Sequence, residues 1–125
     1  MTIHRVALVD DDSDIRALGS LSLRNVGGGE CVLFGSAAEV HAGLRQAAAD
    51  VVLLDVTLGD ADGVAVLAEL RASGFDTPVI FVTGSIQQAD MARYGSSGVL
   101  GVIAKPFNPL TLAAQVQQLF GAAAV

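Results

Sequence analysis

The amino-acid sequence predicts an α/β fold, in which a five-stranded, mostly parallel sheet alternates with helices that cover both of its faces. Short apolar runs rich in Val, Ile and Leu carry this prediction, because strands covered on both faces read in this way. Segments of helical spacing separate the runs. The length of 125 residues suits one domain, expected to span residues 1–125. The runs place strands at residues 6–9, 31–34, 51–54, 79–82 and 99–104.

The first strand stops at three consecutive aspartates, at positions 10–12, and a helix follows. Ser13 is the expected N-cap of this helix, because a serine side chain accepts a hydrogen bond from an unpaired amide of the first turn. The glycines at positions 27–29 are expected to end the helix. Its inward face should carry the residues at helical spacing: Ile15, Leu18 and Leu21 or Ser22.

Two more helices are expected after the second and third strands. Ser36 is the expected N-cap of the earlier one. The third strand stops at Asp55, a polar turn follows over residues 57–63, and Gly74 ends the later helix. The inward residues are expected to be Val40, Leu44 and Ala47 or Ala48 in the earlier helix, and Val64, Leu67, Ala68 and Leu70 in the later one.

The last third of the chain repeats the alternation. Pro78 opens the fourth strand, which stops at residues 83–85, and the weakly periodic residues 86–97 are expected to form a helix. The fifth strand ends before Lys105, and Asn108 with Pro109 is expected to begin the final helix. That helix should turn one face inward, with Leu112, Val116 and Leu119.

Composition and charge limit the classes of function. Hydrophobic residues make up 52% of the chain, yet no apolar run is long enough to cross a bilayer. The net charge of −6 argues against direct binding to nucleic acid or to an acidic membrane. Cys31 is the one cysteine, expected in the core, and no secretory signal opens the sequence. We therefore expect a cytoplasmic protein whose partner is a protein or a small molecule.

Polar residues stand at the end of four of the five predicted strands. In a flavodoxin-like sheet of strand order 2-1-3-4-5, ligands bind beyond the carboxyl ends of the strands, near the point where the winding reverses. Strands 1, 3 and 4 are then neighbours, so the polar residues that end the strands should converge. These residues are Asp10 and Asp11, Asp55, Thr83 and Lys105.

This set of side chains favours phosphoryl transfer. Three carboxylates close together repel one another, and a divalent hard cation such as Mg²⁺, with Mn²⁺ as an alternative, relieves that repulsion. Asp55 would be the nucleophile, Thr83 would hydrogen-bond a phosphoryl oxygen, and Lys105 would neutralise charge. Gly84 would leave the site open. A purely structural ion pair between Asp55 and Lys105 is the alternative without function.

The chain resembles the response-regulator receiver family over essentially its whole length. The residues that carry the resemblance are the run VALVDDD at 6–12, LLD at 53–55 with DG at 62–63, VTG at 82–84, and KPF at 105–107. The resemblance implies a five-stranded parallel sheet, phosphotransfer from a sensor histidine kinase or a histidine phosphotransfer protein, and magnesium dependence. It also implies a phosphoprotein with no enzymatic activity beyond its own phosphorylation and slow autodephosphorylation.

The resemblance assigns roles at the metal site. Asp55 is expected to be the phosphoacceptor, Asp11 a direct metal ligand, and Asp10 a ligand that acts mainly through water. The backbone carbonyl of Thr57 completes the metal site. Neither Thr57 nor Ser85, the positions best placed to steer an attacking water, carries an acid or an amide, so slow hydrolysis of the aspartyl phosphate is expected.

Thr83 corresponds to the switch threonine of the family, and Lys105 precedes Pro106 in a peptide bond expected to be cis. Two positions depart from the family pattern. Val102 stands where an aromatic residue usually couples to the switch threonine, so the usual switch cannot operate in its ordinary form. Gly59 stands where proline is frequent, which should loosen the loop after the acceptor.

Other functions remain as alternatives. A degenerate receiver would bind a partner without phosphorylation, but the acidic pair, Thr83 and Lys105 are all present. A phosphohydrolase of the haloacid dehalogenase type would need a second aspartate where Thr57 stands, and a nucleotide-binding module would need a glycine-rich turn between a strand and a helix. Without an output domain, the chain would act as a messenger or a phosphate shuttle. It would dock through residues 99–104 and the last helix, as a monomer or a phosphorylation-dependent dimer.

Overall fold

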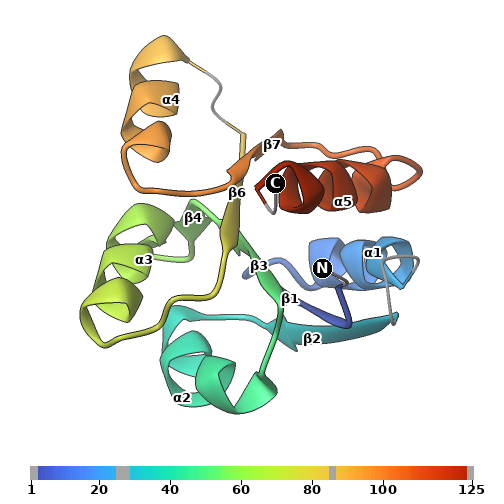
Figure 1. Cartoon of the computed structure of the whole chain (residues 1–125), viewed down its shortest axis with the longest axis horizontal. Coiled ribbons are helices and arrows are strands. Elements are labelled where there is room, and N and C mark those ends of the chain that lie inside the picture. The colour runs from blue at the N-terminus through green and yellow to red at the C-terminus, as the bar shows by residue number, and fades with distance from the viewer. Residues whose placement is uncertain (1–2, 25–28, 85–86, 124–125) are drawn as a thin grey trace.

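The computed structural model describes residues 3–24, 29–84 and 87–123. A five-stranded parallel sheet of order β2-β1-β3-β6-β7 runs through the molecule (Figure 1). When only the strands of this sheet are numbered, in the order in which they follow along the chain, their order across the sheet is 2-1-3-4-5, as predicted. This confirms the flavodoxin-like α/β fold. The strands are β1 (Arg5–Val9), β2 (Glu30–Phe34), β3 (Val51–Asp55), β6 (Val79–Thr83) and β7 (Gly101–Ala104).

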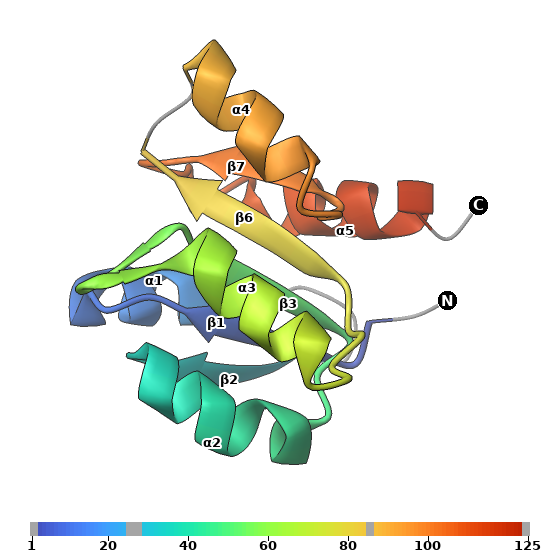
Figure 2. The ribbon, with the colours of Figure 1, turned by 90° about the vertical axis from the view of Figure 1, so that its left-hand side faces the viewer.

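In the described part of the chain, five helices cover the sheet, two on one face and three on the other (Figure 1 and Figure 2). The side chains of a strand point alternately to its two faces. In β1, Val6 and Leu8 therefore pack toward α1 and α5, whereas Ala7 and Val9 pack toward α2, α3 and α4. The helices are α1 (Ser13–Leu23), α2 (Ala37–Ala47), α3 (Gly63–Ala72), α4 (Gln88–Gly95) and α5 (Leu112–Ala123).

Helix α1 departs from prediction in its cap and in part of its inward face. Asp12, and not Ser13, is the N-cap, because its carboxylate accepts hydrogen bonds from the amides of the first turn. Leu18 and Leu21 are 40% and 62% exposed. Ile15 and Ser22 face the core as predicted, and the helix also turns Gly19 inward, where a Cβ would lie 2.5 Å from Leu8 Cδ2. The missing side chain thus allows α1 to approach the sheet closely. Of the expected glycine stop, positions 27 and 28 lie outside the described residues.

The segment after the third strand contains structure that the sequence did not predict. The expected polar turn at 57–63 includes a short antiparallel hairpin, formed by β4 (Thr57–Leu58) and β5 (Ala61–Asp62). In the following helix α3, Val66 is buried, whereas Ala68, which was expected to point inward, is exposed. Ser36 caps α2 as predicted.

Three boundaries in the last third of the chain are also shifted. The α-helix α5 begins at Leu112, because Asn108 first forms a turn in which its side chain accepts from the Leu110 amide. Phe120 is buried on this helix, whereas Leu119 is only partly buried. Helix α4 and strand β7 are both shorter than the segments 86–97 and 99–104 that were expected, and residue 86 lies outside the described residues.

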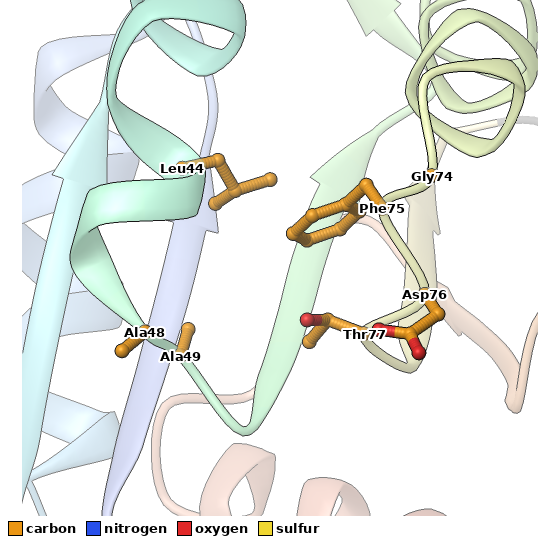
Figure 3. Close-up of a pocket in the computed structure, with 7 residues that line it drawn as sticks. All are labelled: Leu44, Ala48, Ala49, Gly74, Phe75, Asp76 and Thr77. Carbon is orange, nitrogen blue, oxygen red and sulfur yellow. The ribbon is translucent and has the colours of Figure 1, made fainter.

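Within the described ranges, the helices are all too short or too polar to cross a membrane. Cys31 is partly buried, and burial raises the pKa of its thiol to about 11. A hollow of about 270 Å³ opens where α2 ends and β6 begins, lined by Leu44, Phe75 and Thr77 among others (Figure 3). It lies at the amino ends of β3 and β6, which is the edge of the sheet opposite the polar strand ends.

Candidate functional site

The carboxyl ends of four strands bring the predicted polar residues to one edge of the sheet. Asp10 follows β1, Asp55 ends β3, Thr83 ends β6 and Lys105 follows β7. In the order β2-β1-β3-β6-β7 these four strands are consecutive, so the residues at their ends converge. Asp10, Asp55 and Thr83 are 1%, 4% and 3% exposed, whereas Asp11 is exposed. The site thus has a buried floor and an open acidic rim.

Lys105 joins the two buried carboxylates. Its ammonium nitrogen lies 2.7 Å from Asp10 Oδ2 and 3.0 Å from Asp55 Oδ2. The backbone holds the lysine in place, because its amide donates to the Thr83 carbonyl at 2.7 Å. Lys105 is the one lysine of the sequence. A single ammonium group therefore neutralises part of the charge of two carboxylates that would otherwise be buried without compensation.

The remaining carboxylate oxygens accept hydrogen bonds from the backbone. Asp55 Oδ1 accepts from the Thr57 amide at 3.1 Å, and Asp10 Oδ1 accepts from the Asp12 amide at 2.9 Å. Arg16 donates to the Asp10 carbonyl at 2.7 Å. Each buried carboxylate thus has one oxygen held by the main chain and one by Lys105, which fixes the orientation of both groups.

Burial and charge shift the acidity of the central pair. Burial raises the pKa of the Asp55 carboxyl, and the Asp10 charge raises it further, against the hydrogen bonds from Lys105 and Thr57. For Lys105, burial lowers the pKa of the ammonium, but the hydrogen bonds and charges of Asp10 and Asp55 outweigh burial and raise it. Lys105 therefore stays protonated. Ionisation of Asp55 is less favourable than that of an exposed aspartate unless a further positive charge lies nearby.

The donor set suits a divalent cation. Asp10, Asp11 and Asp55 each offer a carboxylate oxygen, and these three oxygens lie within 4.8 Å of one another. Three carboxylates against the one ammonium of Lys105 leave two negative charges when all are ionised. Oxygen ligands and this excess of charge are what Mg²⁺ prefers in proteins. The cluster can therefore hold the kind of metal that the sequence predicts.

The start of α3 packs directly against the backbone of Asp55. A Cβ at Gly63 would lie 2.3 Å from the Asp55 carbonyl oxygen and 2.8 Å from Val56 Cα, so only glycine allows this approach. The Gly63 amide donates to the Val56 carbonyl at 2.6 Å. Asp62 caps α3 and also pairs with Arg93 of α4. The loop after Asp55 is therefore held by its contacts with α3 and by the ion pair between Asp62 and Arg93 of α4.

Other residues singled out in the sequence lie around this centre. Gly84 is exposed, and Gly59 adopts a positive φ of 61° at the tip of the β4–β5 hairpin. The Lys105–Pro106 peptide bond is cis. Val102 is half-buried in β7, where it pairs with Phe81 of β6. Ser85 lies outside the described residues.

Tyr94 is a residue of this site that the sequence did not single out. Its hydroxyl lies 3.2 Å from the Thr83 hydroxyl, and its side chain is buried at 2% exposure. Tyr94 lies on α4, in the segment 86–97 whose sequence is weakly periodic. A lone tyrosine in the helix after the Thr83 strand was the available signal, but only the tertiary structure brings its hydroxyl to Thr83.

A hollow of about 390 Å³ lies beside the acidic cluster, between the β4–β5 hairpin and α4. Its lining includes Thr57, Gly59, Asp62, Arg93 and Tyr94. The loop after Asp55 therefore forms one wall of an open space, and Tyr94 forms part of another.

Comparison with known proteins agrees with this arrangement. The model of the response regulator receiver domain family matches residues 6–117. The DNA-binding response regulator MtrA of Mycobacterium tuberculosis is 31% identical over 114 residues, covering 91% of this chain and 49% of MtrA. The regulatory protein VanRc of Enterococcus gallinarum is also 31% identical, with 91% of this chain and 48% of VanRc covered. The chain spans about half the length of these curated relatives.

Solved structures show the same fold. The chemotaxis response regulator CheY4 of Vibrio cholerae superimposes with a TM-score of 0.82 at 28% identity, covering 94% of this chain and 99% of CheY4. The response regulator DrrB of Thermotoga maritima gives a TM-score of 0.83 at 27% identity, covering 98% of this chain and 54% of DrrB. With the family model matching most of its length, the chain belongs to the response regulator receiver domain family of two-component signal transduction.

Proposed function

We propose that Asp55 accepts a phosphoryl group from a phosphohistidine of a sensor histidine kinase or a histidine phosphotransfer protein. The observation that supports this most directly is the position of Lys105, whose ammonium lies between the buried carboxylates of Asp10 and Asp55. A half-buried lysine and two buried carboxylates at the carboxyl edge of a parallel sheet form a site for an anion and a cation together.

In the proposed reaction an Asp55 carboxylate oxygen attacks phosphorus, so that a P–O bond forms as the P–N bond to the donor histidine breaks. The imidazole leaves with the electron pair of that bond. The Thr57 amide, which donates to Asp55 Oδ1, keeps the carboxylate oriented for attack. Lys105 pairs with the transferred phosphoryl group, and the Thr83 hydroxyl donates to one of its oxygens.

Asp11 and Asp10 would hold Mg²⁺ or Mn²⁺, with an Asp55 oxygen and the Thr57 carbonyl, and the ion would neutralise the charge of the phosphoryl oxygens. Three carboxylate oxygens that lie within 4.8 Å of one another support this assignment of the metal site. The assignment of a direct contact to Asp11 and a water-mediated one to Asp10 rests on the family resemblance.

A mass measurement after incubation with Mg²⁺ and acetyl phosphate tests the acceptor. We expect one added phosphoryl group on the wild-type chain and none on Asp55→Asn or in excess EDTA. Asp60→Asn is the matched control, because Asp60 is an exposed aspartate in the loop after the acceptor and should still allow the adduct. An unmodified wild-type chain, or an adduct that persists in Asp55→Asn, would overturn the proposal.

The lifetime of the adduct separates this function from a phosphohydrolase. Thr57 is exposed beside Asp55 and offers neither an acid nor an amide to an attacking water. We therefore expect the isolated adduct to hydrolyse slowly and to accumulate. Rapid turnover of acetyl phosphate without accumulation would favour the phosphohydrolase, and binding of a partner to Asp55→Asn as tight as to the phosphorylated chain would favour a degenerate receiver.

For the partners of these 125 residues we infer proteins, because a net charge of −6 opposes contact with a phosphate backbone. The expected docking face is formed by β7 and α5, where a hollow of about 270 Å³ is lined by Val102, Ile103 and Leu119, among others. We expect the exchange in the cytoplasm. Measuring the molecular mass in solution with and without phosphodonor decides between a monomer and a phosphorylation-dependent dimer.

A further inference from the structure

The guanidinium of Arg16 reaches from α1 back to the loop that carries the first acidic residues. Arg16 lies near the start of α1, and its Nη1 donates to the Asp10 carbonyl oxygen at 2.7 Å. This short distance is typical of a hydrogen bond with an ionised donor, which is roughly twice as strong as one between neutral groups. The contact is partly buried, which strengthens it further. Arg16 therefore holds one particular peptide group of this loop.

The peptide group that Arg16 holds joins Asp10 to Asp11. A peptide group is planar, so a fixed carbonyl oxygen also fixes the direction of the following N–H and the position of the next Cα. The Asp10 amide is held as well, because it donates to the Phe34 carbonyl at 3.0 Å. The backbone at Asp10 is thus fastened on one side by the end of β2 and on the other by α1.

Asp11 depends on this backbone more than the other two carboxylates of the cluster do. Asp10 and Asp55 are buried, and Lys105 and backbone amides hold their oxygens. The Asp11 side chain is exposed, so its direction depends mainly on the backbone that carries it. One of its oxygens nevertheless lies within 4.8 Å of an oxygen of each buried carboxylate. The orientation of the Asp10–Asp11 peptide therefore determines whether the third carboxylate faces the cluster.

We propose that Arg16 is a positioning residue of the metal site, which presents the Asp11 carboxylate to a divalent cation by holding the Asp10–Asp11 peptide. This inference rests on the proposed metal site. Charge and positioning have opposite effects here. A guanidinium near the cluster repels a cation, so its removal should tighten cation binding if charge dominates. Removal should weaken binding if positioning dominates, and we expect this result because the guanidinium contacts the ligand-bearing backbone directly, whereas salt and water screen its charge.

Gly35 keeps open the space that the Arg16 side chain occupies. A Cβ at this position would lie 2.9 Å from Arg16 Nη1 and 3.0 Å from Glu39 Oε2. Nη1 is the atom that donates to the Asp10 carbonyl. Both neighbours are the ends of flexible side chains, so an alanine should displace them and leave the main chain in place. Gly35→Ala therefore disturbs the hydrogen bond without removing the arginine.

A titration of the unphosphorylated chain with Mn²⁺ tests the proposal without relying on phosphoryl transfer. Electron paramagnetic resonance measures the free ion, and Mg²⁺ is then added as a competitor. We expect Arg16→Met to bind both ions about tenfold more weakly than the wild type. Gly35→Ala should also lose affinity. Arg16→Lys keeps the charge and a donor for the carbonyl, so it should recover most of the affinity that Arg16→Met loses.

Arg5→Met is the matched control for the loss of charge. Arg5 begins β1, at the edge of the sheet opposite the acidic cluster, and this variant should bind the ions as the wild type does. The double variant of Arg16→Met and Gly35→Ala should lose no more affinity than Arg16→Met alone, because both substitutions act on one hydrogen bond. Urea unfolding of each variant without metal checks that the affinities belong to folded protein.

The outcomes separate this inference from the proposed function. An affinity of Arg16→Met equal to or above that of the wild type would overturn the positioning role and leave the metal site intact. Arg16→Lys binding as weakly as Arg16→Met, with Gly35→Ala binding as the wild type does, would overturn it as well. A wild-type chain that binds neither ion would overturn the metal site and this inference together.

Discussion

Lys105 and Asp55 meet across a strand that separates them: their strands β7 and β3 are both paired with β6, yet the ammonium nitrogen lies 3.0 Å from Asp55 Oδ2. The same nitrogen lies 2.7 Å from Asp10 Oδ2 beyond β3. The lysine side chain therefore spans the carboxyl edge of the sheet and links its last strand to its centre. Lys105 therefore both stabilises the fold and supplies positive charge beside the proposed acceptor Asp55.

Replacement of Lys105 by methionine should destabilise the metal-free protein. Removing one partner of a buried ion pair costs roughly 3–5 kcal/mol, and we expect about 1–3 kcal/mol here because Lys105 is 22% exposed. Mg²⁺ should then restore more stability to Lys105→Met than it adds to the wild type, since two carboxylates have lost their cation. Urea unfolding with and without MgCl₂ measures both effects.

Arg5→Met is the control for this variant. Arg5 pairs with Glu30 at 2.8 Å on the surface, where an exposed pair contributes roughly 0–1 kcal/mol. Its unfolding should respond to Mg²⁺ as the wild type does. An equal gain from Mg²⁺ in Lys105→Met and in the wild type would show that the ion does not bind beside Lys105.

Gly63→Ala should disturb the loop that holds the acceptor. The added Cβ would meet the Asp55 carbonyl oxygen at 2.3 Å and the Val56 backbone at 2.8 Å, so main chain must move. Overpacking of this kind typically costs about 1–3 kcal/mol, and we expect at least that loss in urea unfolding. Gly121→Ala in α5 meets no atom within 4 Å and should be neutral or slightly stabilising. Equal stability of the two variants would contradict the close approach.

Two serines near helix starts should differ in their contribution to stability. Ser36 accepts from the Glu39 amide at 3.2 Å, and Glu39 accepts in return from the Gly35 amide at 2.9 Å. Ser36→Ala should therefore lower the free energy of unfolding by about 1 kcal/mol. Ser13→Ala should change it by less than about half of that, because Asp12 is the cap of α1. A larger loss for Ser13→Ala would restore Ser13 as the cap.

Asp50 should make stability depend on pH in the acid range. Its carboxylate accepts from the amides of His4 and Arg5 at 2.8 and 3.0 Å, and the hydrogen bond from the His4 amide is the main reason why its pKa is lowered. A carboxyl with a lowered folded-state pKa stabilises the fold above its unfolded-state pKa. That contribution is lost as pH falls through the folded-state value.

Asp50→Asn should therefore cost about 1 kcal/mol near neutral pH, a value reduced for solvent exposure, and progressively less in acid. Urea midpoints measured from pH 7 down to about pH 3 follow this difference. Asp76→Asn, which alters an exposed aspartate at the same edge of the sheet, should leave the pH dependence unchanged. A difference between Asp50→Asn and the wild type that is constant with pH would contradict this account.

Local patterns were sufficient to predict the fold and the convergence of the polar residues that end its strands. Strands buried on both faces read as apolar runs, and each run stops where a polar residue meets solvent at the edge of the sheet. Asp10, Asp55, Thr83 and Lys105 were predicted to converge because parallel strands of one sheet share a carboxyl edge. These predictions needed only the order of the elements along the chain.

Features that depend on how elements approach one another were not predictable in this way. Gly19 faces inward because α1 lies close to Leu8, and Gly63 allows α3 to approach the backbone of Asp55. Nothing in the spacing of apolar residues reports such distances. The inward face of α1 was consequently predicted only in part: Ile15 and Ser22 do face the core, whereas Leu18 and Leu21 are exposed.

The sequence by itself determined the α/β architecture, the strand order and the acidic centre around Asp55, because alternation, apolar runs and strand-end residues are written locally in the chain. The tertiary structure decided how that centre is connected to its surroundings. It placed the Tyr94 hydroxyl 3.2 Å from the Thr83 hydroxyl. Contacts of this kind follow from the packing of α4 against the sheet, and a weakly periodic helix carries no record of them.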